Sequence, residues 1–114
     1  MTNITLNPDQ QEAFELLKAN CKKVELYVND DDQKEARCLL EDQKVIDVTF
    51  YSESELCISY TDFEDDDECQ ETYNNHELDE AIIERLFERV ANHTDHLQYF
   101  CNQEYAQKIR DFLK

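Results

Sequence analysis

The sequence predicts a single α+β domain, in which an antiparallel β-meander of about four strands packs against an N-terminal helix and one or two C-terminal helices. Apolar residues recur at helical spacing near both ends of the chain, whereas in the middle they alternate with a period of two between short polar turns. No flexible linker interrupts the 114 residues, so we expect residues 1–114 to form one domain.

The first helix is expected over residues 8–20. Asn7 is a favourable N-cap, Pro8 suits the first helical position, and Gln10 stands where a capping box requires a side chain that can bond back to the cap. Apolar side chains then recur at spacings of three and four, which predicts that one side of this helix faces the core.

Four strands are expected over residues 24–28, 34–40, 44–51 and 55–61. Their connections are too short for parallel crossovers, so the strands should pair antiparallel with their chain neighbours. Alternation predicts the core-facing side chains of the last three strands: Ala36, Cys38, Leu40, Ile46, Val48, Phe50, Leu56, Ile58 and Tyr60.

The C-terminal third is less regular. Asn74 and Glu77 form a second capping-box signature, followed by an apolar stripe that predicts a helix to about Ala91. Residues 96–101 then fit either a strand, followed by a helix over 103–113, or part of one long helix. We favour the strand, and the alternative stays open.

The chain contains no glycine, which excludes the phosphate-cradling loops and dinucleotide fingerprints that need close backbone approach. Positions with positive φ must therefore be taken by Asn or Asp, and Asn20, Asn92 and Asn102 are well placed to end or join elements. The eleven Lys and Arg residues are scattered, so direct nucleic-acid binding is not expected.

The five cysteines are dispersed, and no C-x-x-C pair occurs. The N-terminus lacks the pattern of a signal peptide, and no apolar run is long enough to span a membrane. We therefore expect a cytoplasmic protein that has reduced thiols and no membrane association.

No metal or cofactor site is predicted. An EF-hand loop counted from Asp62 would place Asp67 where glycine is needed and Tyr73 where glutamate is needed. Zinc ligation by His93, His96 and Cys101 would lack the usual second pair of ligands, so we interpret the two histidines as polar loop residues beside a core thiol. The charge allows only loose, unspecific association of Ca²⁺ or Mg²⁺.

Catalysis is not expected either. With 28 carboxylates in the chain, no acid–base pair can be singled out. The serine and cysteine residues lie in no motif that would activate a nucleophile. The sequence therefore favours a non-catalytic protein.

Negative charge is the strongest signal in the chain. The formal net charge is −17, and residues 45–84 hold 14 Asp or Glu but no Lys or Arg. A surface that serves solubility alone normally mixes both signs, and a large excess of one sign costs stability through repulsion. This distribution favours a surface that binds a basic partner.

In charge, size and composition, although in no motif, the chain is similar to small anti-restriction and anti-CRISPR inhibitors and to immunity proteins of nuclease toxins. The leading hypothesis is a DNA mimic that blocks the basic nucleic-acid site of another protein. Phe63, Tyr73, Tyr51 and Tyr60 would supply apolar anchor points. The predicted contacts are Asp62, Glu64, Asp65, Asp66, Asp67, Glu68, Glu71, Glu77, Asp79 and Glu80.

Two alternative functions stay open, and so does the oligomeric state. An immunity protein would bind a nuclease toxin, in some cases beside its active site rather than in it. A regulatory or adaptor domain would bind through its sheet or apolar patches and use the charge for solubility only. A homodimer would extend the acidic surface by symmetry.

Overall fold

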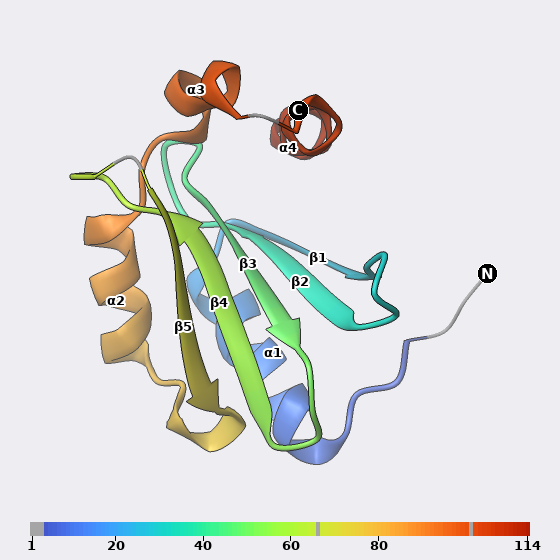
Figure 1. Ribbon diagram of the computed structural model, residues 1–114. Helices are drawn as coiled ribbons and strands as arrows, with labels where there is room; N and C mark the ends of the chain where they lie inside the picture. The colour runs from blue at the N-terminus through green and yellow to red at the C-terminus, as the bar shows by residue number, and fades with distance from the viewer. Residues whose placement is uncertain (1–3, 66, 101) are drawn as a thin grey trace.

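A computed structural model describes residues 4–65, 67–100 and 102–114 and confirms the α+β class (Figure 1). Within these residues no helix is both long and apolar enough to cross a membrane. In chain order the elements are α1 (Pro8–Asn20), β1 (Lys23–Val28), β2 (Lys34–Leu39), β3 (Val45–Phe50), β4 (Glu55–Thr61), β5 (Glu68–Asn74), the 3₁₀ turn η1 (Asn75–Glu77), α2 (Glu80–Arg89), α3 (His93–His96), the 3₁₀ turn η2 (Leu97–Tyr99) and α4 (Gln103–Leu113).

The sheet is an antiparallel meander in the order β1-β2-β3-β4-β5. The four predicted strands are confirmed, and the nine side chains expected to face the core are all buried. A fifth strand, β5, was not predicted. Its side chains alternate between half-buried and exposed, as expected for a strand with one covered face.

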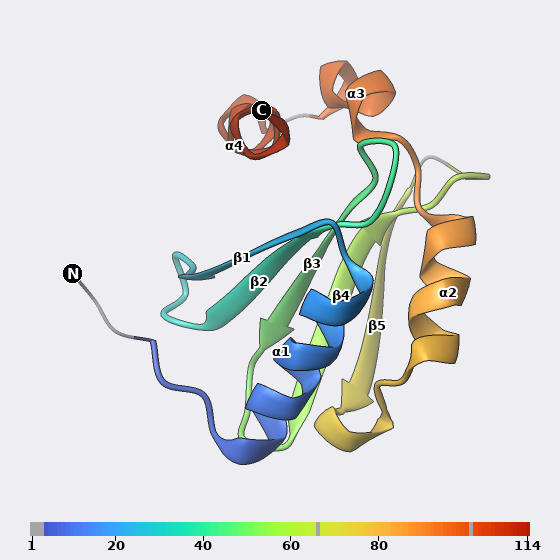
Figure 2. The same ribbon diagram turned by 180° about the vertical axis from the view of Figure 1, so that it is seen from behind.

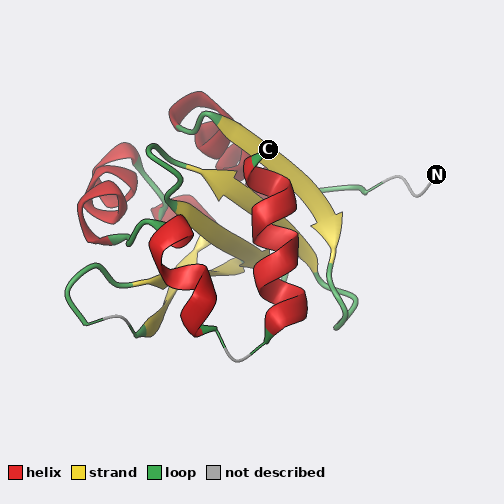
Figure 3. Cartoon of the chain, turned by 90° about the horizontal axis from the view of Figure 1, so that it is seen from above, coloured by secondary structure: helices red, strands yellow, loops and turns green. Residues whose placement is uncertain are grey.

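Helices lie on both faces of the sheet. On one face α1 and α2 cover the main core (Figure 2). At one end of the sheet, α3 and α4 lie close together (Figures 1 and 3), and a second, smaller core joins Val45 to Ala106, Ile109 and Phe112 of α4. On the rest of this second face, Gln70 and Thr72 of β5 are exposed, whereas Cys57 and Ser59 of β4 are half-buried.

The predicted caps are present, although one of them starts a different element. Asn7 and Gln10 form the capping box of α1. Asn74 and Glu77 also form a capping box, but it starts η1, and α2 begins separately with Asp79 as its N-cap. The helix was expected to run to about Ala91; α2 ends at Arg89.

The strand expected at residues 96–101 is wrong. His93–His96 and Leu97–Tyr99 form short helical turns instead, and Cys101 lies outside the described residues. Leu97 is buried and Phe100, three residues later, is half-buried, a spacing that suits a helical turn better than a strand. The helix over 103–113, capped by Asn102, is confirmed.

Positive φ angles occur in the described chain at Asp32, Asp42 and Gln43. Two of these three are aspartates, as expected, whereas Gln43 was not expected. The three asparagines do lie at element ends: Asn20 is the last residue of α1, and Asn92 and Asn102 cap helices with negative φ. Asp42 and Gln43 are consecutive and form the β2–β3 turn, closed by a 2.8 Å hydrogen bond from the Lys44 amide to the Glu41 carbonyl. Such a turn, with two positive φ angles, commonly uses Asn-Gly.

Candidate partner-binding surface

The ten predicted contact residues do not form one continuous patch. Residues 62–67 connect β4 to β5 at one end of the sheet, whereas Glu77, Asp79 and Glu80 lie at the opposite end, around η1 and the start of α2. β5 separates the two groups by about 20 Å, given the usual rise of an extended strand. Asp66 lies outside the described residues.

Two of the ten carboxylates are neutralised by arginines of α2. Arg89 binds the Asp62 carboxylate at 3.0 Å, and the Asp62 side chain is only 4% exposed. Arg85 pairs with Glu71 on β5. Arg85 is the first residue after the one-sign tract and Arg89 follows four residues later, so helix α2 places both arginines next to acids of the tract. Asp62 and Glu71 therefore stabilise the fold, and their charge is not freely offered to a partner.

Glu71 belongs to a closed network on the covered side of β5. Besides Arg85, it accepts hydrogen bonds from the hydroxyl groups of Tyr60 and Tyr73. Burial opposes ionisation of Glu71, but these hydrogen bonds and the Arg85 charge outweigh it and lower its pKa to about 2. The side chain therefore remains ionised and fully partnered at neutral pH.

The other acids are exposed, and two of them also cap helical turns. Glu77 accepts a 3.0 Å hydrogen bond from the Asn74 amide, and Asp79 accepts one of 2.9 Å from the Ile82 amide. These roles explain part of the acidity around the start of α2. The carboxylates that remain exposed without such a role are Glu64, Asp65, Asp67, Glu68 and Glu80.

Helix α2 adds two acids that the hypothesis did not include, Glu84 and Glu88, in a row with Glu80. Glu80, Glu84 and Glu88 are four residues apart and all exposed, so neighbouring side chains lie about 6 Å apart along the outer side of the helix. Among the ion pairs recorded for the described residues, none involves these three acids. Their regular spacing is the sequence signal that could have identified them.

Helix α1 contributes acids to the same side. Glu12 and Glu15 of α1, together with Asp79 and Glu80, line a groove of about 440 Å³ between α1 and the start of α2. Glu15 also pairs at 3.5 Å with Lys18, and both of these side chains are about half exposed. Acids more than sixty positions apart thus lie on one surface, which spacing within a single helix could not predict.

We call this surface the helix-side acidic surface. It consists of the exposed carboxylates of α1, η1 and α2. Its members are Asp9, Glu12, Glu15, Glu77, Asp79, Glu80, Glu84 and Glu88.

The four aromatic anchor candidates have different surroundings. Phe63 is 64% exposed and Tyr51 is 39% exposed, so both can contact another molecule. Tyr60 is buried, and Tyr73 is held in the Glu71 network. The latter two serve the fold.

The histidine region is also more structural than expected. His93 is buried rather than in a polar loop, and its Nε2 lies 2.8 Å from the Val45 carbonyl oxygen. Burial lowers the pKa of His93 to about 4. Within the described ranges, no three His, Cys, Asp or Glu side chains converge as a metal site would require.

The chain was also compared with known proteins. No protein-family model matches it, and no curated protein and no solved structure is similar to it.

Proposed function

We propose that this protein is an acidic inhibitor that occupies the basic nucleic-acid-binding site of another protein, in the manner of a DNA mimic of the anti-restriction or anti-CRISPR type. The observation that carries the proposal is the row Glu80, Glu84 and Glu88, exposed along α2 beside the acids of α1, with no basic side chain of the described residues in ion-pair contact. Arg and Lys side chains of the partner would bind these carboxylates.

The position of the acids on α2 argues against a purely local explanation. Asp79 and Glu80 favour the helix N-terminus electrostatically, but Glu88 lies in the last turn, where the helix dipole disfavours a carboxylate. Like charges four residues apart also destabilise a helix by a few tenths of a kcal/mol per pair. A row that lowers helix stability is easier to understand if its charge serves binding.

The geometry of the row supports mimicry of a nucleic-acid strand. From Glu80 to Glu88 the helix extends about 12 Å, with a negative group every 6 Å or so, a spacing similar to that of phosphates along a strand. The groove acids Glu12 and Glu15 widen the charged area beyond a single line. A surface of this kind would also speed association with a basic cleft by electrostatic steering.

The test uses a charge-neutral triple variant, E80Q/E84Q/E88Q, and a matched control, E25Q/E41Q/E104Q. The control removes the same number of exposed charges away from the helix-side acidic surface. Proteins captured at low salt by the wild type are tested for DNA binding by fluorescence anisotropy, with each variant as competitor. We expect the triple variant to compete at least tenfold more weakly than the control, and wild-type competition to weaken steeply as salt rises.

Equal competition by the two variants would contradict the proposal, as would capture that is insensitive to salt. A captured nuclease that binds this protein and DNA at the same time would instead favour the immunity-protein alternative, with binding beside the active site. Binding that survives both triple substitutions would favour an adaptor domain.

A further inference from the structure

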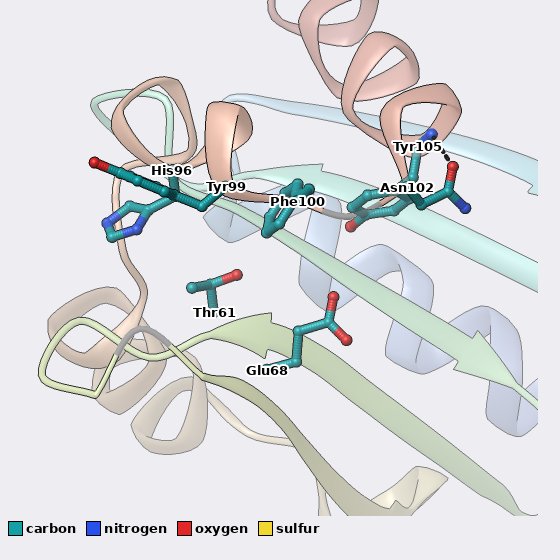
Figure 4. Close-up of a pocket in the computed structure, with 7 residues that line it drawn as sticks. All are labelled: Thr61, Glu68, His96, Tyr99, Phe100, Asn102 and Tyr105. Atoms are coloured by element: carbon teal, nitrogen blue, oxygen red, sulfur yellow. Dashed lines mark hydrogen bonds between the residues drawn. The ribbon is translucent and has the colours of Figure 1, made fainter.

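A pocket of about 800 Å³ lies on the sheet face opposite the helix-side acidic surface, between the end of the sheet and the turn η2 (Figure 4). Thr61 at the end of β4 and Glu68 at the start of β5 form one wall. The rings of Tyr99, Phe100 and Tyr105 form the other wall, in a row that faces Thr61 and Glu68 in Figure 4. Neither the fold nor the proposed function accounts for this pocket.

The aromatic wall is partly fixed and partly exposed. Tyr105 donates a 2.9 Å hydrogen bond to Asp47, and its ring also contacts Arg37 and Phe100. These contacts fix the orientation of the Tyr105 ring. Tyr99, by contrast, is 71% exposed, the largest exposed fraction among the large apolar side chains of the described chain. Tyrosine combines an apolar ring with a polar hydroxyl and is enriched at interfaces, so an exposed Tyr99 beside this pocket suits contact with another molecule.

The charge of the pocket selects the kind of group that fits. Glu68 supplies an exposed carboxylate, His96 is the titratable base among the described lining residues, and these residues include neither Lys nor Arg. Aromatic faces attract cations through their ring electrons, and a nearby carboxylate adds a direct partner. The net charge of −17 would repel phosphate-bearing ligands from the whole molecule.

We propose that this pocket binds an arginine side chain of a basic partner protein, with the guanidinium stacked on Tyr99 or Phe100 and hydrogen-bonded to Glu68. A guanidinium is planar, stacks on aromatic rings and binds carboxylates with two parallel hydrogen bonds, which an ammonium group cannot do. The inference rests on the proposed function for the basic nature of the partner. It assigns the partner a specific anchor, on a different face from the diffuse acidic surface.

The test uses three short peptides that differ at one position: arginine, lysine, or citrulline, which has the shape of arginine without its charge. Binding to the ¹⁵N-labelled protein is followed by NMR at physiological salt, where diffuse charge attraction is screened. We expect the arginine peptide to shift the amide signals of Glu68, Tyr99 and Phe100. The citrulline peptide should bind about fivefold or more weakly, because it loses the cation–π and charged hydrogen-bond contributions.

Variants locate the binding site. E68Q and Y99A should each weaken binding of the arginine peptide about fivefold. E64Q, which removes the same charge from the β4–β5 connection outside the pocket lining, should leave it within twofold. Equal binding of the citrulline peptide, shifts confined to α1 and α2, or no shifts at millimolar peptide would each overturn the pocket assignment. None of these results would affect the competition test of the helix-side acidic surface, so the two proposals can fail separately.

Discussion

The two faces of the sheet differ in whether their charged side chains are buried and paired or exposed. Under α4, Arg37 binds Asp47 at 2.9 Å, the two side chains are only 10% and 9% exposed, and Tyr105 donates to the remaining Asp47 oxygen. On the other face, the row from Glu80 to Glu88 is exposed along α2, and no described residue forms an ion pair with it. The charge buried under α4 therefore stabilises the fold, whereas the acidic row of α2 stays exposed to solvent.

The charges buried on the α4 side are stabilised by hydrogen-bond and ion-pair partners. Burial raises the pKa of Asp47, and Arg37 opposes this effect. The Tyr27 hydroxyl accepts a hydrogen bond from Arg37 and donates one to Glu35, which also accepts from Thr49. A network of this kind is valuable only when every member is present, because a buried charge left alone is costly.

The largest expected effect comes from breaking this network. Asp47→Ala leaves Arg37 buried without its partner, so unfolding by urea should show a loss of about 3–5 kcal/mol. Glu104→Ala, an exposed acid on α4, should change stability by no more than about 0.5 kcal/mol. Replacing both members by apolar residues, R37M with D47L, should recover most of the loss. A small effect of Asp47→Ala would mean that the two faces do not differ as described.

A second, pH-dependent effect should come from His93, which is buried against β3. Its pKa is lowered from 6.5 to about 4 in the folded protein, so between these values the unfolded chain binds a proton that the native protein does not. Stability should therefore fall as the pH decreases from about 6.5 to 4, by up to about 1.4 kcal/mol per pH unit.

The measurement is the difference in unfolding free energy between wild type and His93→Gln at several pH values. Glutamine can still donate to the Val45 carbonyl but does not titrate, so the difference should change over this pH range and stay constant above pH 7. A difference that is independent of pH from 4 to 7 would show that His93 is not kept neutral by burial.

The smallest expected effect is a gain in stability rather than a loss. Neutralising the acidic row of α2 in E80Q/E84Q/E88Q removes two like-charge pairs at a spacing of four, so stability should rise by about 0.5–1 kcal/mol at low salt. The gain should shrink as added salt screens the repulsion. Thermal unfolding with and without salt measures both. Destabilisation by this variant would assign the row a structural role and remove the distinction between the two faces.

Much of the sheet could be predicted from alternation, but β5 could not. Its covered positions are Cys69, Glu71 and Tyr73, so a glutamate stands in the middle of what would otherwise be an apolar face. Glu71 can be covered only because Arg85 and two tyrosine hydroxyl groups satisfy it. Arg85 belongs to helix α2, which follows β5 in the chain, so the alternation of residues within the strand cannot reveal that Glu71 is paired.

The negative charge of the acidic surface could be predicted from the sequence, but the residues that form the surface could not. The one-sign tract indicated a charged surface. In the folded protein, however, Asp62 and Glu71 are paired with arginines, and Glu84 and Glu88 of α2 belong to the exposed acidic surface. The pocket beside Glu68 was not predictable, because the residues around Tyr99 were expected to form a strand. Its walls meet only in the folded chain.

The strand order has a consequence for how the protein folds. Each strand pairs with the next one along the chain, so the sheet can grow by closing short loops in sequence, which favours rapid folding. Helix α1 is the exception, because it is made first but packs against η1, more than fifty residues further on. During synthesis α1 must therefore wait until the whole meander has emerged, and its docking is the step that would complete the main core.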